Sequence, residues 1–193
     1  MTFQQINYPV TYEVDTPETL SRWLWLFKWI LVIPHLIILS ILGFVALIAV
    51  FFAWFAIIFT GKCPRGVFDF VLQVMRWNAR VGGYLSHFTD EYPPFSMDAL
   101  PEYPVRLDVP YSDHSDRLTV FFRAILYIPH YIILGILASV IWLVMLVHIV
   151  IVVFTGKPNT GVLRFLVGYN RWNTRVSMYL LLATDKYPPF SLD

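Results

Sequence analysis

Two histidines stand out because each directly follows a proline inside a long apolar stretch. His35 lies within residues 22–60, and His130 lies within residues 117–155. An ionisable side chain is costly in such surroundings and commonly marks a functional position. Brought together, the two imidazoles could bind a haem iron or another metal. The alternative is structural: each histidine donates to a carbonyl freed by its proline, or lies near a membrane interface.

Two arginine pairs form a second candidate site. The members of each pair are four residues apart, so they project from one face of a helix and could bind lipid phosphates. Alternatively, the arginines pair with two aspartates that follow them and pin the helix to the next segment. The residues of this candidate site are Arg76, Arg80, Arg171, Arg175, Asp90 and Asp185.

Other patterns that support catalysis are missing from the sequence. It contains no nucleotide-binding loop, no Cys/His cluster with metal-ligand spacing and no nucleophile elbow. The single cysteine, Cys63, has no partner for an intrachain disulfide. Acidic residues are absent from both apolar stretches, which argues against a proton-coupled pump. We therefore expect a protein that is not an enzyme and that has no metal or cofactor, with haem as a minor alternative.

The chain is a tandem duplication. Matching residues recur 95 positions later without a gap, as Pro129 follows Pro34 and Gly156 follows Gly61. The repeats are residues 1–98 and 99–193. His148 breaks the pattern, since Ala53 occupies the matching position, and this weakens a paired-ligand scheme.

Five motifs recur in both repeats: IPH, FTGK, RWN followed by RV, TD, and YPPFS. This ordered series resembles the DUF4389 family of small prokaryotic membrane proteins, here as two fused units. The resemblance implies membrane residence and the limits of the repeats. It implies no reaction and no catalytic residues, because the family has no assigned function.

Composition and charge favour an integral membrane protein. Hydrophobic residues make up 58% of the 193 residues and charged residues only 14%, whereas soluble domains are usually about 45–50% apolar. A net charge of +1 provides no field that would attract nucleic acid. We therefore expect membrane lipids as partners, with other membrane subunits or a second copy as possible additions.

Each apolar stretch is too long for one simple crossing, because residues 22–60 as a straight helix would measure roughly 57 Å against a hydrocarbon core of roughly 30 Å. We expect a helical hairpin that turns at residues 40–43, and at 135–139 in the second repeat. The alternative is an interfacial helix ending at Pro34, followed by one crossing over residues 36–59. Basic residues flank both ends of both stretches, which favours hairpins with both termini in the cytoplasm.

The remaining elements follow from local patterns. Alternating apolar residues predict short strands at 8–14 and 103–109 that could pair across the repeats. Thr16, Pro17 and Glu18 resemble a helix start, and the apolar stretches end in glycine caps with lysines beside them, at Gly61, Lys62, Gly156 and Lys157. Apolar steps of three and four predict an amphipathic helix at the membrane surface after each cap. A proline-rich tail then folds back as a lid.

The predicted fold is an all-α integral membrane protein built from two repeats, each with a short strand, a hydrophobic helical hairpin, an interfacial amphipathic helix and a proline-rich tail. We expect a structural or lipid-interacting, non-enzymatic protein of the cell membrane. One alternative is an accessory subunit of a larger redox or transport complex. Another is a haem-binding electron carrier that uses His35 and His130.

Overall fold

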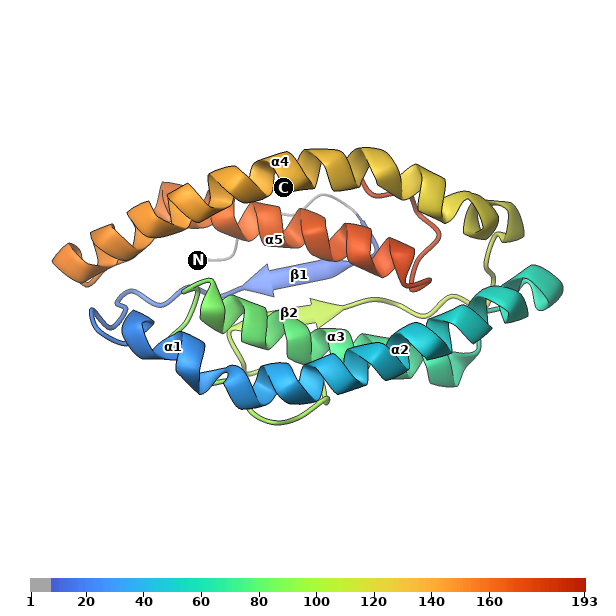
Figure 1. Ribbon diagram of the computed structural model, residues 1–193, viewed down its shortest axis with the longest axis horizontal. Helices are drawn as coiled ribbons and strands as arrows, with labels where there is room; N and C mark the ends of the chain where they lie inside the picture. The colour runs from blue at the N-terminus through green and yellow to red at the C-terminus, as the bar shows by residue number, and fades with distance from the viewer. Residues whose placement is uncertain (1–7) are drawn as a thin grey trace.

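The computed structural model describes residues 8–193 and is mostly helical (Figure 1). Each repeat contributes one strand, one long apolar helix and one shorter helix. The first repeat also contains a brief additional helix before its long one. In chain order the elements are β1 (Thr11–Val14), α1 (Trp25–Leu31), α2 (Ile33–Thr60), α3 (Arg65–Leu85), β2 (Val105–Asp108), α4 (Arg117–Thr155) and α5 (Thr160–Leu180).

The expected helical hairpins are wrong, because both apolar stretches continue as helix through the proposed turns. Gly43 lies within α2, and Gly135 lies within α4. Ser40 also remains helical, and its hydroxyl donates to the Ile37 carbonyl at 2.7 Å. A continuous helix pairs its own backbone groups, whereas a tight turn in apolar surroundings would leave several of them without partners.

The prolines affect the two repeats differently. In the first repeat the helix is interrupted at Val32, between α1 and α2, so that Pro34 lies in the first turn of α2. In the second repeat α4 continues past Pro129. The expected helix start at residues 16–18 is also wrong: α1 begins at Trp25, and α4 is capped by Asp116, whose carboxylate accepts from the backbone N–H groups of Leu118 and Thr119.

The two strands pair across the repeats as predicted. They are antiparallel, with Thr11 opposite Asp108 and Val14 opposite Val105. Each strand then packs against the shorter helix of the other repeat, β1 on α5 and β2 on α3. The repeats therefore exchange their first segments, and neither repeat is a self-contained unit.

Contacts between the repeats are reciprocal. The Leu20 N–H donates to the Gly156 carbonyl at 3.0 Å, and the matching Ser115 N–H donates to the Gly61 carbonyl at 2.9 Å. Each long helix thus ends beside the start of the other repeat's apolar stretch, and α2 and α4 run antiparallel (Figure 1). Such reciprocity indicates an approximate twofold axis between the repeats.

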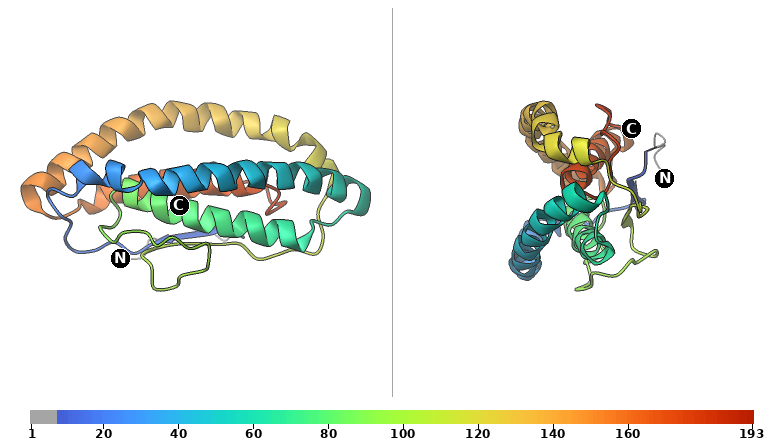
Figure 2. Two further views of the ribbon diagram at one scale, coloured as in Figure 1. Left: turned by 60° about the horizontal axis from the view of Figure 1, so that its bottom comes forward. Right: turned by 90° about the vertical axis from the view of Figure 1, so that its right-hand side faces the viewer.

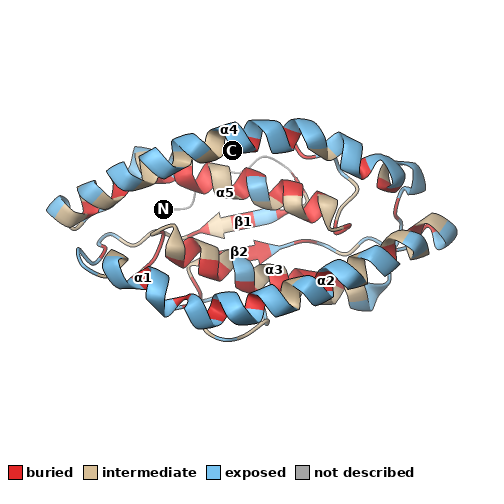
Figure 3. Ribbon diagram, viewed as in Figure 1, coloured by how far each residue is buried: buried red, intermediate tan, exposed pale blue. Residues whose placement is uncertain are grey.

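The helices are arranged in layers. The end-on view in Figure 2 shows α2 and α4 on one side, α3 and α5 in the middle, and the strands with the irregular connections on the other side. Helices α3 and α5 form where expected, and their location at a membrane surface stays a prediction. Most of their residues are covered by the other layers, as the colours in Figure 3 show.

Candidate functional site

Each apolar stretch carries one histidine in an aromatic enclosure. The Trp77 Nε1–H donates to Nδ1 of His35 at 3.0 Å, and the Phe95 ring stacks on the imidazole with centroids 3.8 Å apart. The second repeat reproduces the arrangement, with a Trp172 to His130 hydrogen bond of 3.1 Å and Phe190 stacked at 4.0 Å. Both histidines are completely buried.

This geometry assigns the protons. Because Nδ1 accepts the tryptophan hydrogen bond, the neutral imidazole carries its proton on Nε2. That nitrogen is buried and has no partner among the described residues in either repeat. The expected hydrogen bond from histidine to a carbonyl near the proline does not form. Instead the tyrosine hydroxyls of the tails donate to helical carbonyls of the apolar stretches, Tyr92 to Leu31 in α1 and Tyr187 to Leu126 in α4.

The enclosures also separate the two histidines. His35 lies among aromatic side chains of the first repeat and His130 among those of the second, so the imidazoles do not meet across the twofold axis. In the part of the chain that the structure describes, no group of three or more His, Cys, Asp or Glu residues is placed to hold a metal ion. The described residues therefore do not bring the two imidazoles together as the paired haem-ligand hypothesis requires.

The four arginines of the candidate site are engaged inside the protein. Arg80 donates to the Ser96 and Asp98 carbonyls, and Arg175 donates to the Asp193 carbonyl, so these two arginines fasten the tails. Arg76 and Arg171 instead reach the exchanged strands, where they donate to the Leu107 and Tyr12 carbonyls. Burial lowers the pKa of Arg175 to about 10, a value at which it stays protonated at neutral pH.

The expected pairing of these arginines with Asp90 and Asp185 is wrong. Asp90 pairs with Lys28 at 2.9 Å, and Asp185 pairs with Arg123. Lys28 is only 1% exposed, and its ammonium also donates to the Thr89 carbonyl at 2.7 Å. Burial lowers the pKa of Lys28, whereas its hydrogen bond and charge interaction with Asp90 act in the opposite direction. Each tail is thus pinned to the start of its own apolar stretch.

Sequence reasoning missed these two ion pairs, although a signal existed. Both repeats carry a base at the matched positions 28 and 123 and an acid at 90 and 185. Comparison of the repeats could have revealed that the base and the acid recur together.

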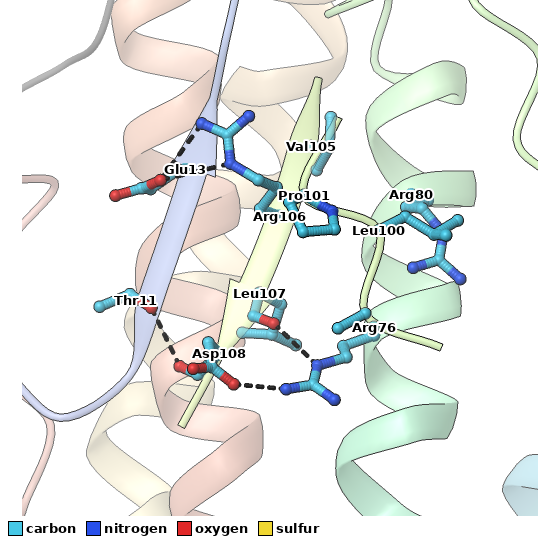
Figure 4. A pocket seen from close by; sticks show the side chains of 11 residues that line it. Thr11, Glu13, Arg76, Arg80, Leu100, Pro101, Val105, Arg106, Leu107 and Asp108 are labelled. Atoms are coloured by element: carbon cyan, nitrogen blue, oxygen red, sulfur yellow. Dashed lines mark hydrogen bonds and ion pairs between the residues drawn. The ribbon is translucent and has the colours of Figure 1, made fainter. Parts of the chain in front are cut away.

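The strand side of the molecule holds a hollow of about 250 Å³, shown in Figure 4. Arg76, Arg80 and Arg106 are among the residues that line it. Arg106 pairs with Glu13 at 3.2 Å and with Asp15 at 2.6 Å, and Arg76 pairs with Asp108 at 2.5 Å. These contacts tie the strands to each other and to α3, so the arrangement stabilises the exchanged segments.

One end of the molecule differs from the other. A small cavity is lined by Trp25, His87, Asp90 and His148. Both ring nitrogens of His148 and the indole N–H of Trp25 are buried without partners among the described residues. At the other end the positions of Trp25, His87 and His148 are taken by the apolar residues Val120, Leu182 and Ala53. Burial and the nearby charge of Lys28 lower the pKa of His87 to about 3.

The predicted helix caps form. Gly61 and Gly156 take left-handed conformations, with φ of 73° and 69°. Lys62 and Lys157, which follow them, are exposed. The guanidinium of Arg117 lies beside Gly61, and that of Arg22 lies beside Gly156. An exposed arginine and an exposed lysine therefore sit together at each end of the molecule.

These features define a duplicated helical protein with two strands exchanged between its repeats and two helices that are long and apolar enough to cross a membrane. The chain belongs to the family described as Domain of unknown function (DUF4389), which matches residues 22–97 and 117–191. One matched region lies within each repeat. Neither the comparison with curated proteins nor that with solved structures found a match.

Proposed function

We propose that this protein is a non-enzymatic, lipid-interacting membrane protein, held in the bilayer by the outer surfaces of α1, α2 and α4. The observation that carries the proposal is the exposure of these helices. In the most apolar part of each long helix, only 17% of the α2 residues and 11% of the α4 residues are buried. A core helix of a soluble protein is mostly buried, so that explanation does not fit.

The exposed surface is apolar on nearly all sides of each helix. Along α2 the buried residues His35, Leu39, Ala46, Ala53 and Ile57 follow one narrow stripe. Large side chains such as Phe44, Phe51 and Phe52 are 59–66% exposed on the remaining circumference. Apolar patches on soluble monomers rarely exceed a few hundred Å². A surface that continues along two whole helices is typical of contact with acyl chains.

The non-enzymatic part of the proposal rests on the polar residues. The arginine pairs of the candidate site, Asp90 and Asp185, and the two buried histidines fasten tails, strands and helices to one another. Their guanidinium and carboxylate groups meet protein partners, which leaves a structural role as the function that best accounts for them.

Flotation of the purified protein with lipid vesicles tests the proposal. We expect the protein to rise with the vesicles and to remain bound after an alkaline carbonate wash, because apolar contact does not depend on charge. Ile48→Arg, on the exposed side of α2, should weaken flotation, whereas Asn78→Arg, on an exposed position of α3, should not. Protein that stays at the bottom of the gradient would refute membrane residence.

Native mass measurement after gentle solubilisation tests whether the protein acts alone. A monomer or a homo-oligomer is expected. Stable co-purification with other membrane polypeptides would instead favour the accessory-subunit alternative.

A further inference from the structure

We infer that the protein lies lengthwise in the membrane, with α2 and α4 embedded along one leaflet and the strand layer in water, rather than crossing the bilayer. This inference rests on the proposed membrane function and specifies the orientation. The partner surface is the acyl region of a single leaflet, bordered by anionic headgroups.

The layers of the fold supply the first argument. In the end-on view of Figure 2, the apolar helices α2 and α4 form one side, and the strands and irregular connections form the opposite side. The difference in polarity therefore runs across the molecule and not along its length. A bilayer surface parallel to the long axis separates the apolar layer from the polar one.

The strand layer would be in the wrong solvent if the molecule crossed the bilayer. Figure 1 shows β1 and β2 near the middle of the long axis. Charged side chains here are partly open, with exposed fractions of 42% for Glu13, 47% for Asp15 and 66% for Asp108. A spanning orientation would hold these ion-paired but partly exposed groups at mid-bilayer, where a single Asp, Lys or Arg costs about 2.5–3.5 kcal/mol on insertion scales. In the lengthwise orientation the same side chains face water.

Helix length argues in the same direction. The part of α4 without Asp, Glu, Lys or Arg, residues 124–155, measures about 48 Å at roughly 1.5 Å per residue. A hydrocarbon core of roughly 30 Å takes about 39 Å of helix at the upper end of observed tilts, near 40°. Such a segment is too long to cross at ordinary tilts. Lying lengthwise, a helix about 10 Å wide fits within one leaflet of roughly 15 Å.

The positions of the free cations supply the fourth argument. Arg22 and Lys157 lie at one end of the molecule and Lys62 and Arg117 at the other. All four are exposed, and none of their side chains has a hydrogen bond or ion pair with the rest of residues 8–193. A spanning orientation would place equal basic pairs on both sides of the membrane, against the positive-inside tendency. The lengthwise orientation lets all four reach the anionic headgroups of the cytoplasmic leaflet.

Depth measurements on spin-labelled protein in vesicles test the orientation. In a Cys63→Ala background, single cysteines replace Ile37, Phe44, Phe51 and Phe59, which are exposed along α2. Collisional broadening by oxygen and by a water-soluble nickel complex reports the depth of each label. We expect all four labels to be oxygen-accessible and to lie at similar depths. A deep centre with shallow ends would overturn the inference, as would low accessibility to both reagents.

Thr11→Cys, an exposed position in β1, is the matched control on the opposite face. A membrane-impermeant thiol reagent should label it fully, because the strand layer faces water. Protection of this cysteine in reconstituted vesicles that expose the strand side would overturn the inference. Failure of the protein to float with vesicles would refute the proposed function itself, so the two outcomes can be told apart.

Discussion

The tryptophan to histidine hydrogen bonds explain how an apolar helix tolerates a titratable side chain. The indole N–H satisfies Nδ1, and a phenylalanine ring covers the imidazole face, in both repeats. A buried polar atom without a partner is costly. The hydrogen bond therefore satisfies both the indole N–H and Nδ1 of the imidazole, each of which would be destabilising if buried alone. It also joins the long helix to the shorter helix of the same repeat.

Removing the indole donor should destabilise the fold. Trp77→Phe keeps an aromatic ring but leaves Nδ1 of His35 unpaired in the core, at a cost of about 1–3 kcal/mol. Trp172→Phe should give a similar loss, since the second repeat has the same contact. Chemical unfolding in detergent measures both. Trp142→Phe, at a 74% exposed position, is the control; equal losses for all three variants would contradict this account.

His87 should make stability depend on pH. Its pKa falls from an ordinary 6.5 to about 3 in the folded protein, so the unfolded chain binds the proton more strongly between these values. The contribution of neutral His87 to the stability of the fold is therefore complete above pH 6.5 and is lost as the pH falls towards about 3. The nearby groups are Lys28, His148 and Asp90.

His87→Leu should flatten this decline. Leucine is the residue at the matching position, Leu182, where φ is 66° against 58° for His87, so the backbone geometry accommodates it. Thermal unfolding in detergent at pH 7, 6, 5 and 4 compares the variant with the parent protein. His114→Gln, at an exposed histidine, should retain the parental slope. A His87→Leu protein with the same slope would show that other groups control the decline.

At the scale of elements, the conformations of the glycines distinguish a continuous helix from a hairpin. Gly43 and Gly135 lie inside α2 and α4, and an added Cβ would meet nothing within 4 Å at either position. Gly61 and Gly156 instead have positive φ at helix ends. Glycine therefore has a conformational role at the caps and none in the middle of the helices.

Gly43→Ala should stabilise the protein by about 0.5–1 kcal/mol, because alanine lowers the entropy of the unfolded chain without meeting a neighbour. Gly61→Ala should destabilise the protein, since the backbone at residue 61 has a left-handed conformation that alanine adopts only with strain. Unfolding free energies measure both. A loss of stability with Gly43→Ala would argue for a turn at this residue, as in the hairpin, and against a continuous helix.

The exchanged strands depend on a close approach between β2 and α3. A Cβ on Gly83 would lie 2.5 Å from a methyl group of Val105, whereas a Cβ on the neighbouring Gly82 would meet nothing within 4 Å. Gly83→Ala should therefore destabilise the protein by about 1–3 kcal/mol through overpacking. Gly82→Ala is the matched control and should not destabilise it. Equal effects in unfolding experiments would argue against the close packing of the strand on α3.

At the scale of the whole molecule, duplication produces a body with equivalent basic ends. Antiparallel long helices bring the start of one apolar stretch to the end of the other, so Arg22 joins Lys157 and Arg117 joins Lys62. The polar and the apolar layer both extend along the length of the molecule, side by side (Figure 2). This is the arrangement that favours a lengthwise position in one leaflet.

Neutralising the two ends should weaken binding to anionic vesicles equally. Each lysine or arginine near an anionic surface contributes about 1 kcal/mol. Arg22→Gln with Lys157→Gln, and Lys62→Gln with Arg117→Gln, should therefore each reduce the preference for anionic over zwitterionic vesicles by roughly tenfold or more. Partitioning at low and high salt measures the effect, which should vanish at high salt. Unequal losses would argue that only one end reaches the headgroups.

Local patterns in the sequence determined part of the architecture of this protein. The duplication, the glycine caps at Gly61 and Gly156, the pairing of the two strands and the helices after each cap follow from spacing, periodicity and backbone preferences. Tertiary structure alone decided which residues meet. Contacts of Asp90 with Lys28, of Arg76 with Asp108 and of Trp77 with His35 join residues far apart in the chain. Hairpin and continuous helix have the same apolar composition, so only the packing of each long helix along its whole length distinguished them.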